Sequence, residues 1–401
     1  MKTTKLYILS AIFAMCLLLG WSINFFAAGA VHKLWTQMVW TGQEEPTTDQ
    51  GATVRVALLL DTSNSMSGLI NQAKSQLWNI VNELQKLELD GETPRVMISL
   101  YQYGNDHLRE DKHYVEQLLP LTTDMDKVSE HLFGLAVYGG SEYCGAAIGH
   151  ALENLEWGTS DKDLRMIYIA GNESFEQGPI SYAKVQQMAA RKNIKINTIF
   201  CGSQADGTVL GWSAAAALGG GTHLHMDHNM ATAYQSTPYD DQIQDLNNRL
   251  NRTYVPYGQL GNSRQMTQRQ QDQNAHKIDK ANAVDRAVFK GSKAYNNAKW
   301  DLVDAYKKDK SILKKKDLGL KGKMPKSTKE LEKLIQTKEK QRKAIQEEIR
   351  QLDKKRRKYL SEKPVEEQAK NLKNAIVTSV EKATVDRKKK KSLTKSPAKA
   401  Q

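Results

Sequence analysis

The chain has 401 residues, which is enough for one large domain and a further region, because single cores usually stop growing at about 250–300 residues. Hydrophobic residues make up 40% of it, and this share suits a globular protein diluted by polar segments. The net charge of +13 is unevenly placed: residues 301–401 hold 32 Lys and Arg against 15 Asp and Glu, whereas residues 1–300 hold 26 against 30. This excludes a uniformly basic protein and indicates a near-neutral body with a basic tail.

The N-terminus has the pattern of an export signal. Lys2 and Lys5 form a short positive region, and an apolar run follows over residues 6–20. Ala28 and Ala30 provide the small residues that a signal peptidase recognises, so we expect cleavage before Val31.

An uncleaved membrane anchor is the alternative, because residues 6–30 carry no charge and a bilayer span needs about 20 residues. Both interpretations place the rest of the chain outside the cytoplasm, in the periplasm or at the cell surface. Cys16 follows Met15 rather than a small residue, which argues against lipoprotein processing. Without the signal only Cys144 and Cys201 remain, so the fold must rest on its core and not on a disulfide framework.

Apolar runs alternate with amphipathic stretches between residues 53 and 228. The first run, VRVALLL, is too short for a helix and suits a central parallel strand buried on both faces. Alternation of strands and helices predicts an α/β fold with a doubly wound, mostly parallel sheet. The predicted strands are residues 54–60, 95–103, 165–170, 195–200 and 222–226, and the predicted helices are residues 67–87, 180–192 and 209–218.

The pattern changes after residue 230. Residues 259–282 are very polar and predict a mobile segment or a solvated helix. Residues 329–360 carry Leu and Ile at helical spacings, but Lys338 and Gln341 interrupt the seam that a coiled coil needs. The run of Arg and Lys at residues 387–391 and the segment after it are expected to be disordered.

Asp61, Ser63 and Ser65 follow directly on the first predicted strand. In an open α/β sheet, ligands bind at the carboxyl ends of the strands, where this loop lies. One carboxylate and two hydroxyls on a single loop can provide oxygen ligands to a hard divalent cation such as Mg²⁺. The simpler interpretation is a helix N-cap, since Asp and Ser are common at helix starts.

The sequence VALLLDTSNSM resembles the first strand and metal-ion-dependent adhesion site of von Willebrand factor A-type domains. The resemblance continues in RVMISLYQYGND, similar to the second strand, and in VYGGSEYCGAAIGHAL, similar to the Gly-Gly-Thr loop and its helix. It covers about residues 53–228 and implies the Rossmann-like fold of that family.

The resemblance also implies the metal ligands. Asp61, Ser63 and Ser65 would form the first metal loop, and Ser141 stands where the family usually has threonine. The third loop departs, because Ala170-Gly171-Asn172-Glu173 replaces the family's Thr-Asp-Gly. Asn172 or Glu173 would then reach inward in place of the aspartate. The implied cofactor is Mg²⁺ or Mn²⁺.

In the family an acidic side chain of a protein partner fills an open position on the metal. This implies a binding module without catalytic residues rather than an enzyme, and the chain has no GxSxG, GxxxxGK[ST] or HExxH motif. We therefore expect an adhesion or scaffold protein of the cell envelope. A structural envelope protein with a degenerate metal site is the alternative, and the altered third loop keeps it open. An enzyme with its activity in the tail is the third hypothesis, against which the tail's few His and Cys residues argue.

Three further features have functional and structural interpretations. His223, His225 and His228 could suit a transition metal, but scattered polar residues on a last strand explain them more simply. Cys144 and Cys201 would both lie near the top of the sheet, which makes a disulfide there a hypothesis. The basic tail is either solvated surface or a site for an anionic envelope polymer or lipid; export makes nucleic acid an unexpected partner.

The predicted organisation along the chain has six parts. They are a signal peptide or anchor (1–30), a linker (31–52), the A-type domain (53–228), a polar helical or irregular region (229–328), a helical region that could form a coiled coil (329–386), and a disordered basic tail (387–401).

Overall fold

The structure is a computed structural model that describes most of residues 51–362. The described ranges are 51–226 and 236–362, apart from residues 86, 90, 279, 293–294, 316, 321–324 and 326, together with six residues between 378 and 385. The predicted export segment and the tail at residues 387–401 lie outside the described residues. Among the described residues, no helix is both long enough and apolar enough to cross a bilayer.

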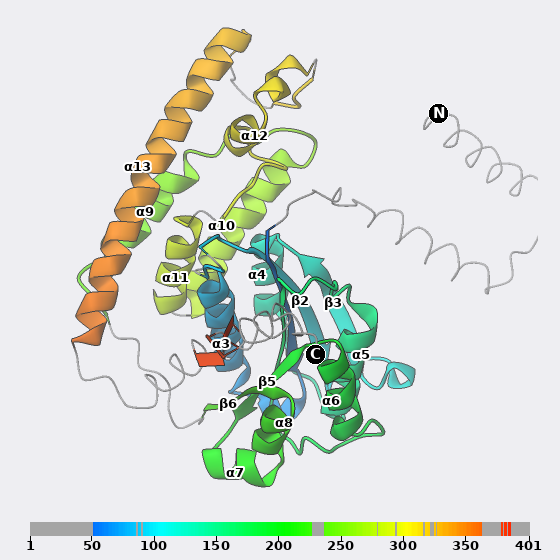
Figure 1. Cartoon of the computed structure of the whole chain (residues 1–401). Coiled ribbons are helices and arrows are strands. Elements are labelled where there is room, and N and C mark those ends of the chain that lie inside the picture. The colour runs from blue at the N-terminus through cyan, green and yellow to red at the C-terminus, as the bar shows by residue number, and fades with distance from the viewer. Residues whose placement is uncertain are drawn as a thin grey trace, which may run out of the picture. The chain divides into compact units, whose positions relative to one another are not determined.

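A six-stranded sheet lies at the centre of the A-type region (Figure 1). Its strand order is β3-β2-β1-β4-β5-β6; β2 and β3 are antiparallel, and the other neighbours are parallel. The predicted mostly parallel α/β sheet is therefore confirmed. The strands are β1 (Thr53–Asp61), β2 (Arg95–Tyr103), β3 (Val115–Thr122), β4 (Leu164–Gly171), β5 (Lys195–Cys201) and β6 (Gly220–Met226).

The edge strand β3 was not predicted from the sequence. It contains Pro120, and its exposed and buried residues do not alternate regularly. Its pairing with β2 also shifts register between Ile98 and Leu100 and between Leu100 and Tyr101. An irregular edge strand of this kind lacks the two-residue hydrophobic period that identifies a strand in a sequence.

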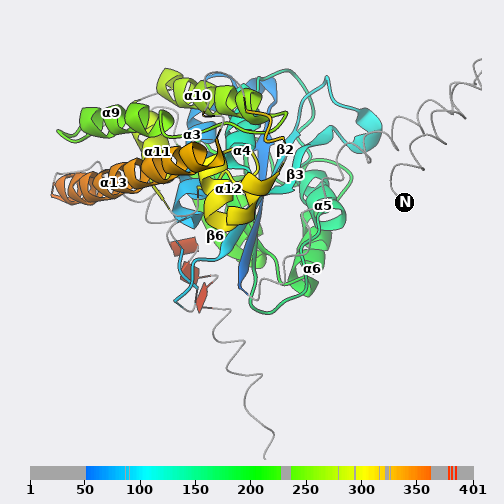
Figure 2. The same ribbon diagram turned by 90° about the horizontal axis from the view of Figure 1, so that it is seen from above.

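Helices cover both faces of the sheet, α3 and α4 on one side and α5 and α6 on the other (Figure 2). The predicted helix over residues 209–218 corresponds to α8, which begins at Trp212. Val209 instead ends a separate short helix, because Gly211 between the two has a positive φ of 86° that interrupts helical geometry. These helices are α3 (Ile70–Leu84), α4 (Met125–Gly134), α5 (Cys144–Asn154), α6 (Tyr182–Arg191), α7 (Gln204–Val209) and α8 (Trp212–Leu218).

The remaining helices follow the sheet in the sequence. The very polar stretch at residues 259–282 contains α10 as a regular helix, in which Gln268 and Gln271 are buried. These helices are α9 (Asp240–Asn251), α10 (Gly261–Ile278), α11 (Lys280–Lys290), α12 (Leu302–Lys308) and α13 (Thr328–Ser361).

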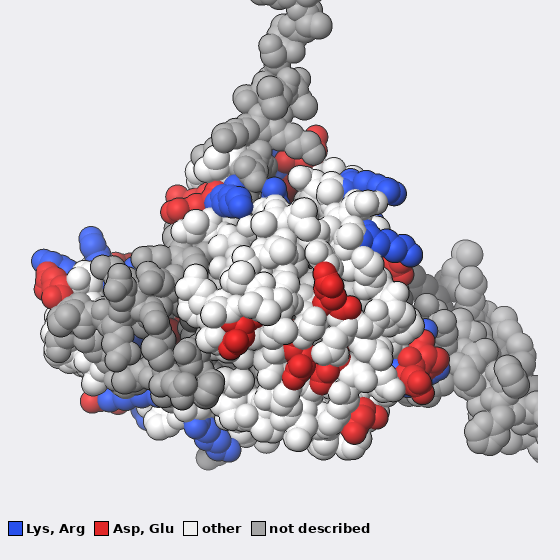
Figure 3. Space-filling model, turned by 90° about the horizontal axis from the view of Figure 1, so that it is seen from below, with Lys and Arg blue, Asp and Glu red and all other residues white. Residues whose placement is uncertain are grey.

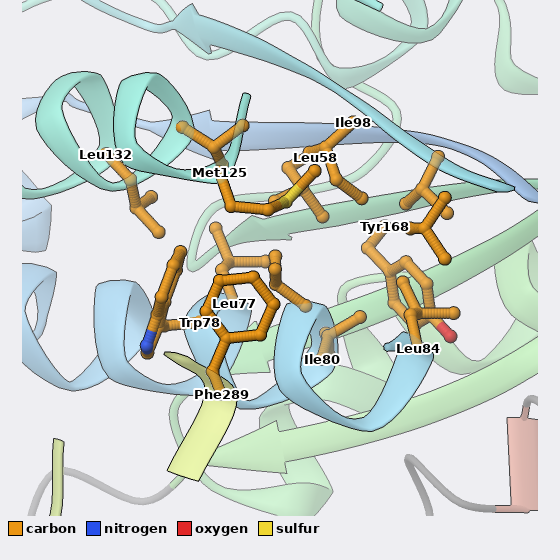
Figure 4. Packing of buried hydrophobic residues seen from close by; sticks show 14 of the residues in the cluster. Leu58, Leu77, Trp78, Ile80, Leu84, Ile98, Met125, Leu132, Tyr168 and Phe289 are labelled. Carbon is orange, nitrogen blue, oxygen red and sulfur yellow. The ribbon is translucent and has the colours of Figure 1, made fainter. Parts of the chain in front are cut away.

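The C-terminal helices share a hydrophobic core with the α3 side of the sheet. Trp78 of α3 and Phe289 of α11 meet edge to face with ring centroids 6.2 Å apart, beside Leu77 and Met125 (Figure 4). Ile345 and Ile349 of α13 belong to the same buried cluster. Residues of the predicted polar region (229–328) and of the predicted helical region (329–386) thus form part of the covering of this face.

Helix α13 packs within the chain along one side. Its buried apolar residues contact α9, α11 and α12. Ser327 caps its N-terminus, where the Ser327 side chain accepts a hydrogen bond from the backbone N–H of Glu330. The side chains buried on this face include Leu331, Ile335, Ile345, Ile349 and Leu352.

Candidate metal site

The first loop of the candidate site begins at the carboxyl end of β1. Asp61 is the last residue of that strand, and a short 3-10 helix (Asn64–Met66) turns the chain immediately afterwards. The backbone N–H of Ser63 donates to Asp61 Oδ1 at 2.8 Å, and the Ser63 and Ser65 hydroxyls lie 2.9 Å apart. The structure therefore brings together the three oxygen ligands that the Asp-x-Ser-x-Ser spacing predicted.

Asp61 is 1% exposed, and among the described residues its Oδ2 atom has no hydrogen-bond partner. Burial raises the pKa of Asp61 to about 7; interactions with Ser63 oppose this rise, and the nearby carboxylates of Glu142 and Glu173 add to it. A buried carboxylate oxygen without a partner is costly, and a bound cation would compensate it. This observation favours a metal at the loop.

The second loop approaches the first through close backbone contacts. An ideal Cβ on Gly140 would lie 2.4 Å from the carbonyl oxygen of Gly104, so only glycine fits there. The backbone N–H of Tyr138 donates to the carbonyl of Thr62 at 2.9 Å, which ties the second loop to the first. Ser141 is half-buried just before α5.

The third loop places Asn172, and not a carboxylate, against the first loop. The Ser65 hydroxyl donates to Asn172 Oδ1 at 3.0 Å, and Asn172 Nδ2 donates to the Ser65 carbonyl at 3.3 Å. The Glu173 carbonyl accepts from Trp212 Nε1 at 2.7 Å, and its carboxylate is near enough to Asp61 to raise the pKa of that residue. Both third-loop candidates from the sequence thus lie at the site.

Glu142 belongs to the same group but was missed from the sequence. Burial raises its pKa; the Glu173 carboxylate adds to the rise and the Ser63 side chain lowers it, which places Glu142 beside both loops. The family resemblance directed attention to the neighbouring Ser141, where a threonine is usual. The available signal was a carboxylate directly after the Gly-Gly-Ser sequence.

The donor set at the candidate site is made of hard oxygen ligands. No group of three His, Cys, Asp or Glu side chains within the described part of the chain is arranged to hold a metal ion. Hydroxyl and amide oxygens must therefore contribute, and such ligands suit Mg²⁺ or Mn²⁺. Asp61, Ser63 and Ser65 would hold the ion, with Ser141, Asn172 and Glu173 around them.

The face that surrounds the site is acidic. Four of its loops, at residues 61–69, 135–143, 171–181 and 201–211, contain no Lys or Arg, whereas the loop after β2 carries Lys112 and Arg109, which pairs with Asp111. Figure 3 views the molecule from this end, and acidic side chains stand on a largely uncharged central surface with basic ones nearer its margin. Without a cation, this face would repel an acidic partner.

The histidines of β6 and the two cysteines serve the fold. His223 Nδ1 lies 2.8 Å from the hydroxyl of Thr198, and burial, with a smaller effect of His225, lowers the pKa of His223 to about 4. His228 lies outside the described residues. The proposed disulfide is wrong: Cys144 and Cys201 are free, because they belong to hydrophobic clusters on opposite faces of the sheet.

Comparison with known proteins identifies the domain family of the chain. The model of the von Willebrand factor type A domain matches residues 56–259, and the chain belongs to this family. The match extends past the predicted domain end at residue 228 and includes α9. No curated protein matches the chain.

Several solved structures resemble the chain in fold. Proximal thread matrix protein 1 from the mussel byssus, in a structure with a zinc-occupied MIDAS motif, shares 9% identity with a TM-score of 0.34, covering 45% of this chain and 43% of the mussel protein. BatB, a conserved hypothetical protein from Bacteroides thetaiotaomicron, shares 16% identity with a TM-score of 0.33, covering 43% of this chain and 90% of BatB. An aerotolerance-related membrane protein from Bacteroides fragilis shares 16% identity with a TM-score of 0.32, over 44% of this chain and 94% of that one.

Proposed function

We propose that this chain is an exported, non-enzymatic binding protein of the cell envelope, whose domain captures a protein partner through a divalent metal ion. Asp61, Ser63 and Ser65 hold Mg²⁺ or Mn²⁺ in this proposal, and an acidic side chain of the partner fills the open position. The observation that supports it is the buried, unpartnered Oδ2 of Asp61 among hydroxyl and carboxylate oxygens. An adhesion or scaffold role follows, because the cation joins two proteins without a chemical step.

Calorimetric titration of Mg²⁺ and Mn²⁺ into the metal-free full-length chain tests the metal. We expect saturable binding that Asp61→Ala abolishes and that Glu176→Gln leaves unchanged, since Glu176 is exposed on the same face. Circular dichroism of both variants shows whether the fold is intact. If the wild-type chain releases no heat with either metal and gains no thermal stability from it, the proposed function is wrong.

The open position is tested with acetate as a probe for an acidic side chain. Manganese bound at the site speeds the relaxation of water protons through the water that it coordinates. Acetate that displaces this water should lower the relaxation enhancement in a saturable way, whereas the same concentration of chloride should not. If acetate does not lower the relaxation enhancement, the site does not bind an acidic partner through the metal. The metal site itself is not contradicted by that result.

A structural envelope protein with a degenerate metal site is the second candidate. The mutual hydrogen bonds between Ser65 and Asn172 support it, because they satisfy that hydroxyl without a cation. Under this alternative, Asp61→Ala changes neither metal binding nor partner capture. The titration above therefore separates the two candidates.

The alternative assigns binding to the basic region. The run at residues 387–391 is outside the described residues, but α12 and the turn after it carry exposed lysines. Anionic lipid or envelope polymer is the fitting partner, held by charge and released by salt. Co-sedimentation with vesicles of phosphatidylglycerol and phosphatidylcholine should weaken as the salt concentration rises from about 50 to about 300 mM, because added salt screens the charges. The exposed residues are Lys307, Lys308, Lys310, Lys314 and Lys315.

A further inference from the structure

The third loop of this chain lacks the carboxylate that the family's metal loops supply, and the structure offers a replacement from the second loop. We propose that Glu142 is the second carboxylate ligand of the metal ion. The inference rests on the proposed metal site and specifies which residue completes it. Glu173, which the sequence favoured equally with Asn172, then lies beside the ion without holding it.

The position of Glu142 follows from Gly104 at the end of β2. An ideal Cβ on Gly104 would lie 2.7 Å from Asp61 Oδ1 and 3.1 Å from Glu142 Cγ. Asp61 Oδ1 and Glu142 Cγ therefore both lie close to the same point beside Gly104. Gly104 also has a positive φ of 75°, so a side chain is disfavoured there both by backbone conformation and by space.

In the observed arrangement, the third-loop side chain that hydrogen-bonds to the first loop is neutral. Asn172 occupies the place next to Ser65 with a neutral amide, which both accepts from and donates to that residue. Glu173 is held at its backbone by Trp212, through the hydrogen bond to its carbonyl. Of the two glutamates, Glu142 contributes more than Glu173 to raising the pKa of Asp61, which agrees with a closer approach.

No cation in the described part of the chain forms an ion pair with these acids. Among the described residues, Asp61, Glu142 and Glu173 form no ion pair, and the loops that carry them contain no Lys or Arg. Three neighbouring carboxylates repel one another, and of these Asp61 is buried and Glu142 is half-buried. A dication held by Asp61 and Glu142 would remove this repulsion, and their two charges would balance its own.

A consequence for partner recognition follows from this charge balance. With Glu142 in place, the ion and its two carboxylates carry no net charge, so a partner's carboxylate gains little from long-range attraction. With a neutral residue at position 142, the loaded site would carry an additional positive charge. Removal of the Glu142 carboxylate should therefore lower the affinity of the site for the metal ion. It should also raise the affinity of the metal-loaded site for the probe carboxylate.

The experiment titrates Mn²⁺ into metal-free full-length chain by calorimetry, for the wild type and for Glu142→Gln, Glu173→Gln and Glu176→Gln. Loss of a residue that only orients a ligand costs about 10–100-fold in metal affinity, so loss of a ligand should cost at least tenfold. We expect this loss in Glu142→Gln, less than threefold in Glu173→Gln, and no change in Glu176→Gln. At saturating Mn²⁺, acetate should bind several-fold more tightly to Glu142→Gln than to the wild type.

Thermal unfolding in EDTA distinguishes a ligand from a structural residue. Without metal, Glu142→Gln should melt at the wild-type temperature or above it, because it removes repulsion from Asp61 and Glu173. The inference is overturned if Glu142→Gln binds Mn²⁺ like the wild type while Asp61→Ala does not, or if Glu173→Gln shows the larger loss. In both cases the proposed metal function stands. If the wild-type chain binds no Mn²⁺, the inference about Glu142 and the proposed metal function are both overturned.

Discussion

Arg286 of α11 donates a hydrogen bond of 2.7 Å to Asp126 of α4, although the two residues are 160 positions apart. Arg286 is 1% exposed and also pairs with Asp272 of α10 at 2.7 Å. Tyr295 donates to the second oxygen of Asp126 at 2.7 Å. The acidic side chain on the sheet domain is thus satisfied by residues that lie beyond the end of the family match, which makes the C-terminal helices part of its folded unit.

Arg286→Met should destabilise the chain by about 3–5 kcal/mol, because removing one partner leaves buried carboxylates without their charge. Arg357→Met is the matched control: Arg357 forms an ion pair with Asp353 at 3.0 Å, but its side chain is 49% exposed, so we expect less than about 1 kcal/mol. Urea unfolding of both variants at pH 7 gives the two values. Equal losses in the two variants would show that the buried ion pairs of Arg286 stabilise the fold no more than the exposed pair of Arg357.

Phe289→Ala should cost about 3–5 kcal/mol of the free energy of unfolding. The ring is 3% exposed and packs edge to face against Trp78, so its loss leaves a cavity between α11 and α3. Leu218→Ala, at a side chain that is 65% exposed, should change stability by less than about 0.5 kcal/mol. Denaturant unfolding followed by tryptophan fluorescence measures both. A Phe289 variant as stable as the Leu218 variant would mean that the helical layer is only loosely attached.

The sequence predicted the central sheet well because its central strands are short and rich in apolar and β-branched residues. β2 was placed with its observed ends, Arg95 and Tyr103, and β1 within one residue at each end. The C-terminal helices were not recognised as part of the core, because their buried faces carry polar residues. Gln268, Gln271 and Arg286 lie inside the protein, and an amphipathic pattern cannot identify a buried face made of hydrogen-bonded polar groups.

The candidate site was predicted in part for a similar reason. Asp61, Ser63 and Ser65 share one loop, so their spacing alone places them together. Glu142 reaches them through the folding of a second loop against Gly104, a contact that depends on tertiary structure. The third-loop residues could be named as Asn172 or Glu173, but only the structure shows that the Asn172 amide engages Ser65.

The two buried thiols give a direct check of the corrected disulfide. Cys144 is 1% and Cys201 2% exposed, and burial raises the pKa of both thiols, so the reactive thiolate is scarce at neutral pH. N-ethylmaleimide should label neither residue in the native chain within minutes. Both should react in guanidinium chloride without any reductant, as intact mass will show. If the unfolded chain is labelled only after prior reduction, Cys144 and Cys201 form a disulfide after all.

His223 should make stability depend on pH in mildly acidic solution. Burial lowers its pKa from 6.5 to about 4, with a smaller contribution from His225. Between these two values the unfolded chain takes up a proton that the folded chain does not, so stability falls as the pH decreases from about 6.5 to about 4. Above pH 6.5 His223 is neutral in both the folded and the unfolded chain, and below about pH 4 it is charged in both. The loss of stability is therefore confined to the window between these values.

The prediction is measured as the difference between the wild type and His223→Asn, which keeps a polar atom near Thr198 but does not titrate. Asp61 has its pKa raised to about 7 and acts in the opposite direction, and this effect is common to both proteins and cancels in the difference. Thermal unfolding at pH 7.5 and pH 4.5 should show a smaller stability loss for His223→Asn than for the wild type. His276→Asn, at an exposed position on α10, should behave like the wild type. Parallel pH profiles for all three chains would mean that His223 gains its proton as easily folded as unfolded.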